Sequence, residues 1–267
     1  MRQRSYDELI QRLYKIADSP NVEINILGEF EAGGQLYPIV LMRLGTSAPD
    51  KVSVAVAAGI HGDEPASVEA AVRFVEINAG NDSLLSDFYF TIFPCNNPTG
   101  WERNTRDNWQ GIDLNRQFAI RKPAPEVALI MRGLQDRCFD LVFEMHEDID
   151  APGFYLYEIA EAPDYYVGER IIEEVKTMGY PVNHSECIEG IEATGGIIRR
   201  KIRLKRFRKT KVPQAIYIYR TCGGHVITLE PPASVLPLED RVAIELTALN
   251  VTLDAVRNRK ASGATSH

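Results

Sequence analysis

The feature that most constrains the fold is a continuous apolar run, "KVSVAVAAG" at residues 51–59, which is followed closely by a helical pattern. A strand with apolar residues on both faces is typical of a sheet that helices cover on both sides. The helix is predicted from Pro65 to Asn78, because proline suits the first helical position and an apolar stripe runs along one side. A β–α unit of this kind predicts a parallel or mixed sheet.

The same alternation of strands and helices continues along the chain and predicts an α/β fold. Strands are expected at 21–30, 36–45, 88–94, 139–146, 214–220 and 225–230, and helices at 1–18, 125–138, 163–179 and 239–257. With no internal repeat or linker between them, these elements predict one domain over residues 1–259. The last residues, 260–267, are expected to form a disordered tail.

The composition narrows the class of protein. Hydrophobic residues make up 45% of the chain and charged residues 25%, as in an ordinary soluble globular protein. The net charge of −7 argues against general nucleic-acid binding. No apolar stretch is long enough to span a membrane, and the N-terminus lacks the apolar core of a secretory signal, so a cytoplasmic location is expected. The four scattered cysteines predict free thiols.

One segment departs from this acidic average. Residues Arg199 to Lys211, "RRKIRLKRFRKTK", carry nine basic residues and no acid. Such a run is most often a solvated loop or hairpin. The alternative is a patch that contacts an anionic ligand or partner, and the sequence leaves both interpretations open.

Ionisable residues follow four of the predicted strands, at the point where each strand ends. His61 and Glu64 follow the strand at 51–59, and His146 and Glu230 end two later strands. The segment 95–118, "CNNPTGWERNTRDNWQGIDLNRQF", follows the strand at 88–94. Ligands of α/β sheets bind outside the carboxyl ends of the strands, so these groups are expected to converge on one crevice.

Two histidines and one carboxylate together form the ligand set of a catalytic zinc site with an open fourth position. The candidate ligands are His61, Glu64 and His146. Glu147 or Asp148, which follow His146 directly, are alternative carboxylate ligands.

The other candidates suit the remaining needs of hydrolysis. Glu230 is a carboxylate that would activate water as a general base. Arg106 would stabilise a developing oxyanion, with Arg103 as its competitor, and Asn115 with Arg116 would hold a substrate carboxylate. Asp113 is expected to brace the turn before that pair. His225 lies on the opposite face of its strand from Glu230, so a structural role is expected.

Taken together, "HGDE", "NPTGWERNTR", "DLNRQF", the strand-ending "MH" and "TLEPP" resemble the motifs of the zinc carboxypeptidase family over about residues 40–235. Its relatives include the aspartoacylase/succinylglutamate desuccinylase group and the bacterial amidases that trim murein peptides. The resemblance implies a three-layer α/β/α sandwich around a mixed sheet of roughly eight strands. It also implies one zinc ion and assigns the roles given above to His61, Glu64, His146, Arg106, Asn115, Arg116 and Glu230.

The resemblance therefore implies a zinc metallopeptidase or amidase that cleaves an amide bond next to a free carboxylate, in a small peptide or an N-acyl amino acid. An N-acyl amino acid deacylase and a non-catalytic metal- or polyanion-binding protein are the alternatives. One family feature has no counterpart in the motifs, namely the tyrosine that closes over the substrate. Tyr217 and Tyr219 fall in the strand expected at 214–220.

Overall fold

The computed structural model describes residues 4–199 and 212–261 and contains a mixed, eight-stranded sheet. The strand order is β1-β2-β4-β3-β5-β10-β6-β9. The bounds are β1 Val22–Ala32, β2 Gln35–Leu44, β3 Val52–Ala58, β4 Phe88–Phe93, β5 Leu141–Met145, β6 Tyr155–Ile159, β9 Ile197–Ile198 and β10 His225–Glu230. A separate hairpin pairs β7 (Cys187–Ile188) with β8 (Ile191–Glu192).

The centre of the sheet is parallel. β3 pairs in parallel with both β4 and β5, and β5 pairs in parallel with β10. These are the four strands whose ends carry the candidate residues, so their carboxyl ends meet at one edge of the sheet, as predicted. The flanking strands β2 and β6 are antiparallel to their inner neighbours, which makes the whole sheet mixed.

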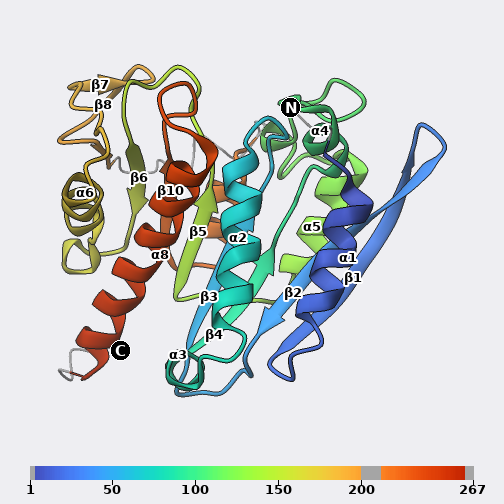
Figure 1. Cartoon of the computed structure of the whole chain (residues 1–267), viewed down its shortest axis with the longest axis horizontal. Coiled ribbons are helices and arrows are strands. Elements are labelled where there is room, and N and C mark those ends of the chain that lie inside the picture. Colours follow the sequence, from blue (N-terminus) through green and yellow to red (C-terminus); the bar gives the residue numbers. More distant parts are fainter. Residues whose placement is uncertain (1–3, 200–211, 262–267) are drawn as a thin grey trace.

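Helices cover both faces of the sheet, which gives the expected three layers (Figure 1). On the face nearest the viewer, α8 packs between α2 and α6, and α1 contacts α2. Behind the sheet, α5 packs on β1 and β2, and α7 packs on β10. The helices are α1 Tyr6–Ile16, α2 Pro65–Asn78, α3 Asp82–Asp87, α4 Pro98–Arg103, α5 Pro125–Leu134, α6 Gly168–Thr177, α7 Gln214–Thr221 and α8 Leu238–Ala261, with short 3-10 turns at Leu114–Arg116 and Pro163–Tyr165.

One predicted strand is wrong. Residues 214–220 are not a strand but most of helix α7. Their alternating isoleucines and tyrosines have high β-propensity, but tertiary contacts decide such short segments. Here Asn115 Oδ1 accepts a hydrogen bond from the Gln214 amide at the helix start, and the ring of Tyr217 packs against Phe118. The helix predicted for 125–138 also ends early, at Leu134.

The C-terminal helix extends further than predicted. α8 continues to Ala261, so it includes the first two residues of the expected tail, and residues 262–267 lie outside the described part of the chain. Among the described residues, no helix combines the length and the apolar character that crossing a bilayer requires. The four cysteines are free thiols, with Cys95 and Cys222 buried and the other two exposed.

Candidate metal centre and active site

His61 and Glu64 lie in the turn between β3 and α2. Pro65 occupies the first turn of the helix and Glu64 is its N-cap residue. Ser67 fastens this turn, since its hydroxyl donates to the Glu64 carbonyl oxygen at 2.7 Å and accepts from the Gly59 amide at 3.1 Å. The backbone therefore directs both side chains toward the end of the neighbouring strand β5, where His146 lies.

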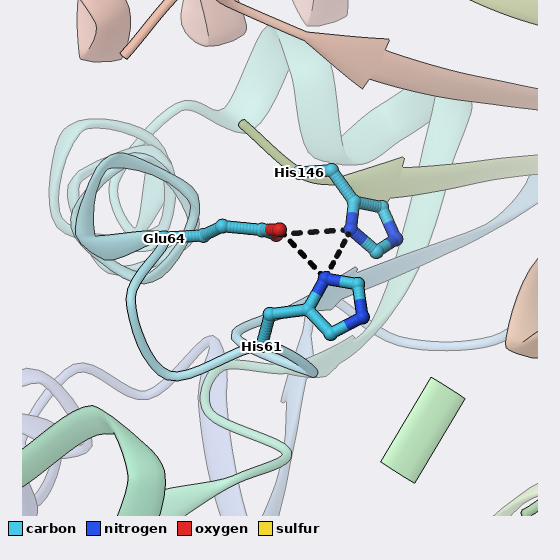
Figure 2. A group of neighbouring side chains, drawn as sticks. All are labelled: His61, Glu64 and His146. Atoms are coloured by element: carbon cyan, nitrogen blue, oxygen red, sulfur yellow. Dashed lines mark hydrogen bonds and ion pairs between the residues drawn. The ribbon is translucent and has the colours of Figure 1, made fainter. Parts of the chain in front are cut away.

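Three side chains meet at this point (Figure 2). His61 Nδ1 lies 2.6 Å from Glu64 Oε1, His146 Nδ1 lies 2.9 Å from Glu64 Oε2, and the two Nδ1 atoms are 3.3 Å apart. All three residues are at least 95% buried. The cluster thus combines the three predicted metal ligands, each offering one donor atom to a common point.

The spacing of the two imidazole nitrogens and the chemistry of the three donors fit a zinc ion. In tetrahedral coordination with bonds of about 2.0–2.1 Å, two nitrogen ligands lie roughly 3.3 Å apart, as the two imidazole nitrogens do here. Two neutral imidazoles and one carboxylate also match the charge and softness that catalytic zinc prefers. Within the described residues this is the one group of three such side chains close enough to hold a metal ion.

Without a metal, the three groups are held together by charge. Burial alone would raise the pKa of Glu64, but the two histidines outweigh it and lower that pKa to about 2. Burial likewise opposes protonation of His61, yet Glu64 and Asp113 raise its pKa to about 9. A metal ion would take the place of the proton on His61, so metal binding should release that proton.

Asp113 supports His61 from the far side of the ring. Its Oδ1 lies 3.5 Å from His61 Nε2 and accepts the Asn115 amide at 2.9 Å, so it braces the turn as predicted. Carboxylates in this position orient ligand imidazoles and raise their basicity.

Glu147 and Asp148, the alternative ligands, lie outside the cluster. The Glu147 carboxylate accepts a hydrogen bond from the Ala66 amide in the first turn of α2 and forms a buried ion pair with Arg241 of α8. Asp148 instead accepts hydrogen bonds from the Tyr155 hydroxyl and the Asp150 amide. Glu147 therefore ties the His146 end of β5 to the Glu64 end of α2.

The cluster opens into a cavity of about 490 Å³. All four remaining candidates line it, together with the three predicted ligands: Arg106, Asn115, Arg116 and Glu230. The cavity therefore brings together the seven residues singled out in the sequence.

Arg106 lies next to the cluster, whereas its competitor Arg103 ends helix α4 and is not part of the cavity wall. Arg106 Nη1 is 3.8 Å from Glu64 Oε1 and Nη2 is 3.3 Å from Asp113 Oδ2. Its carbonyl oxygen accepts the Gly62 amide at 3.4 Å, which connects this loop to the turn that carries His61.

Asn115 is buried and its orientation is set by α7. Because Oδ1 accepts the Gln214 amide at 2.7 Å, the NH₂ end of the carboxamide remains to donate to a ligand in the cavity. Arg116 follows on the exposed side and donates to the Asn115 carbonyl oxygen at 3.1 Å. The pair thus presents donors suited to a carboxylate.

Glu230 ends β10, opposite Tyr155 of β6. Burial raises the pKa of Glu230 well above its usual range, and the charges of Glu64, Glu189 and Asp148 raise it further. A carboxyl group with a raised pKa is a stronger base when ionised and a useful acid when protonated.

His225 has the structural role predicted for it. Its Nε2 lies 2.9 Å from the buried carboxylate of Glu158, on the opposite side of the sheet from the cavity. Arg199, at the start of the basic run, also binds Glu158 and pairs with Glu169. Arg199 is therefore engaged within the fold, and the rest of the run, 200–211, lies outside the described residues.

Several cavity residues were missed by the sequence motifs. Tyr157, Ile159, Glu189, Ile191 and Ile198 come from β6, β9 and the β7–β8 hairpin, in a region that the motifs do not reach. The alternation of residues along β6 would have placed Tyr157 and Ile159 on one face, had that strand been predicted.

Fold and site together define a metal-dependent hydrolase built on a mixed α/β sheet. The family model described as "Zinc carboxypeptidase" matches residues 11–128, a stretch that contains His61, Glu64, Arg106, Asn115 and Arg116. This stretch, a little under half of the chain, is therefore similar to the family of zinc carboxypeptidases. No curated protein sequence matches it.

Solved structures resemble the whole chain. A proposed metallopeptidase of Shewanella denitrificans is 18% identical, with a TM-score of 0.76, over 94% of this chain and 90% of that one. A metallo-carboxypeptidase of Burkholderia cenocepacia is 21% identical, with a TM-score of 0.70, over 96% and 70%. A Pseudomonas aeruginosa metallo-carboxypeptidase in complex with (2-guanidinoethylmercapto)succinic acid is 17% identical, with a TM-score of 0.67, over 95% and 69%. At these identities the likeness concerns the fold, which agrees with the sheet described above.

Proposed function

We propose that the protein is a zinc-dependent carboxypeptidase that hydrolyses the amide bond next to a free carboxylate. One observation carries the proposal: a buried His-Glu-His cluster shares a single cavity with a half-buried glutamate and two arginines. Zinc held by His61, Glu64 and His146 would polarise the scissile carbonyl and lower the pKa of water at the site.

Glu230 is proposed as the general base. Its carboxylate would accept a proton from the attacking water and then donate that proton to the leaving amine. The raised pKa of Glu230 supports both steps, since proton transfer is most efficient when the pKa of the catalyst lies near the working pH.

Arg106 is proposed to stabilise the oxyanion that forms on the scissile carbonyl. Its place beside Glu64 puts a positive charge next to the cluster. Asn115 and Arg116 are proposed to bind the free carboxylate of the substrate. The ligand of the Pseudomonas aeruginosa relative is a succinic acid derivative, and these residues would suit a carboxylate-bearing ligand of that kind.

Metal analysis combined with a Glu230→Gln variant tests this proposal. The variant should keep its zinc but lose at least about 10²–10⁴-fold in kcat, the usual contribution of general acid–base catalysis. A wild-type protein without zinc, or a variant that hydrolyses substrates like wild type, would refute the mechanism.

A substrate panel separates the proposed peptidase from its closest alternative. The panel contains peptides with a free C-terminus, N-acyl amino acids and murein-type peptides. Preference for peptides over N-acyl amino acids supports the carboxypeptidase, whereas the opposite preference identifies an N-acyl amino acid deacylase.

A further inference from the structure

The start of helix α7 is fixed by contacts distant in sequence. Its N-cap residue, Pro213, makes no side-chain cap hydrogen bond. The amide of Gln214, the first helical residue, instead donates to Asn115 Oδ1 at 2.7 Å. Asn115 thus satisfies one of the amides that a helix start leaves free, as a capping residue does. The Asn115 carboxamide and the start of α7 are therefore expected to move together.

A second side chain holds Gln214 from the end of β4. The Asn96 NH₂ group donates to Gln214 Oε1 at 3.1 Å, and both residues are at least 99% buried. Asn96 follows β4, whereas Gln214 lies 118 positions later in the chain. This buried bond therefore ties the start of α7 to the edge of the sheet where the predicted metal ligands lie.

Asn96 is itself anchored beside the metal centre. Its amide donates to the carbonyl oxygen of Ala58, the last residue of β3, at 3.0 Å. β3 leads directly into the turn that carries His61. A continuous chain of contacts thus runs from the end of β3 through Asn96 and Gln214 to the Asn115 carboxamide.

The bond between Asn96 and Gln214 contributes little to stability. Within the described ranges 4–199 and 212–261, the second polar atom of each carboxamide, Asn96 Oδ1 and Gln214 Nε2, is buried without a hydrogen-bond partner. A buried polar atom without a partner lowers stability, whereas two apolar side chains of similar shape would pack here without that loss. The pair is therefore better explained as a contact that fixes a position than as a source of stability.

We propose that Asn96 is a positioning residue, which acts through Gln214 to hold the Asn115 carboxamide in place relative to the metal centre. With Oδ1 engaged by α7, the NH₂ group of Asn115 donates to the substrate carboxylate in the right place only while the helix start stays fixed. This inference rests on the proposed function, because it takes Asn115 as part of the site for that carboxylate.

The zinc-loaded full chain is assayed on the N-acyl dipeptide that wild type cleaves best, and KM and kcat are measured separately. Asn96→Leu should raise KM at least about 10-fold, the lower range for a charge-assisted hydrogen bond, while kcat changes by less than about 3-fold. Gln214→Met should do the same, because it removes the side-chain bond but keeps the backbone amide that binds Asn115. The control is Asn78→Leu, at a buried asparagine at the end of α2 that binds the Phe74 carbonyl oxygen, and it should leave KM unchanged.

Two double variants separate positioning from a general loss of structure. In an Asn115→Ala background, Asn96→Leu should raise KM by less than about 2-fold more, because the group that Asn96 positions is gone. Asn96→Leu combined with Gln214→Met should be at least as stable as either single variant, since neither partner is left unpaired, and should still have the raised KM. Asn96→Ala takes the place of Asn96→Leu if the leucine variant does not fold.

An unchanged KM in Asn96→Leu and Gln214→Met overturns the inference and leaves the proposed hydrolysis intact. A KM that returns to the wild-type value in their double variant, or an equal effect of Asn96→Leu with and without Asn115, overturns it as well.

If wild type cleaves no peptide, the proposed function fails, and the side-chain NH₂ signals of Asn115 in nitrogen-15 NMR spectra test the positioning directly. These signals are assigned with Asn115→Asp. Signals that shift or broaden in Asn96→Leu and Gln214→Met, but not in Asn78→Leu, support the inference, and unchanged signals refute it.

Discussion

Gly62 lies between two predicted metal ligands, and its lack of a side chain has a measurable consequence. A Cβ atom at this position would lie 1.9 Å from the Gly100 carbonyl carbon and 2.2 Å from the Trp101 nitrogen. Both are backbone atoms of helix α4, so no side-chain rotation relieves the clash. We expect Gly62→Ala to push the turn that holds His61 and Glu64 away from α4.

The cost follows from the size of that displacement. Ordinary contacts begin at 3.4 Å, so the backbone must move by about 1.5 Å. Overpacking costs about 1–3 kcal/mol, and the Gly62–Arg106 backbone hydrogen bond adds about 1 kcal/mol if it breaks. The expected loss in the free energy of unfolding is about 2–4 kcal/mol. Because zinc ligands tolerate little misplacement, zinc affinity should fall at least about 10-fold.

Urea denaturation of the metal-free protein and zinc titration against a competing chelator measure the two effects. The control is Gly80→Ala, since a Cβ atom there meets no other atom within 4 Å. That variant should stay within about 1 kcal/mol of wild type. The reasoning is refuted if Gly62→Ala matches Gly80→Ala in stability and binds zinc as tightly as wild type.

Two further predictions concern buried charges. Burial alone would raise the pKa of Glu158, but contacts with His225 and Arg199 lower it below the ordinary value of about 4.3. The ionised Glu158 carboxylate therefore stabilises the fold at any pH above about 4.3, and this stabilisation is lost as the pH falls through the lower pKa of the folded state. Glu158→Gln should therefore lower the free energy of unfolding by about 2–4 kcal/mol at pH 7 and by progressively less below pH 4. Urea denaturation at several pH values measures this loss, and a loss that does not change with pH would contradict the prediction. Arg241→Met leaves the Glu147 carboxylate buried without its cation, which should cost about 3–5 kcal/mol and weaken zinc binding. Adding Glu147→Gln should restore part of the stability in denaturation measurements, and a double variant as unstable as the single one would count against the ion pair.

Much of this fold could be predicted because its central strands are buried on both faces. The apolar run at 51–59 and the two that end at His146 and Glu230 became the parallel strands β3, β5 and β10. The start of α2 could also be predicted from a single residue, because proline at position 65 fits only the first turn of a helix.

The prediction failed where short segments depend on contacts distant in sequence. Residues 214–220 have a strand-like composition, but their conformation depends on Asn115, about a hundred positions earlier. The cavity wall beyond Glu230 is built from strands of two to five residues, too short for periodicity to identify. Glu147 looked like a possible ligand because nothing local signals that its partner is Arg241 of the last helix.

Zinc titration of the metal-free protein tests the central claim most directly. Wild type should bind one zinc ion per chain and release a proton as it does so, because the proposed ligand His61, whose pKa is raised to about 9, holds a proton in the absence of metal. His146→Ala, which removes one of the three proposed ligands, should lose at least about 100-fold in affinity. A wild-type protein that binds no zinc, or a His146→Ala variant that binds it equally well, would contradict the account.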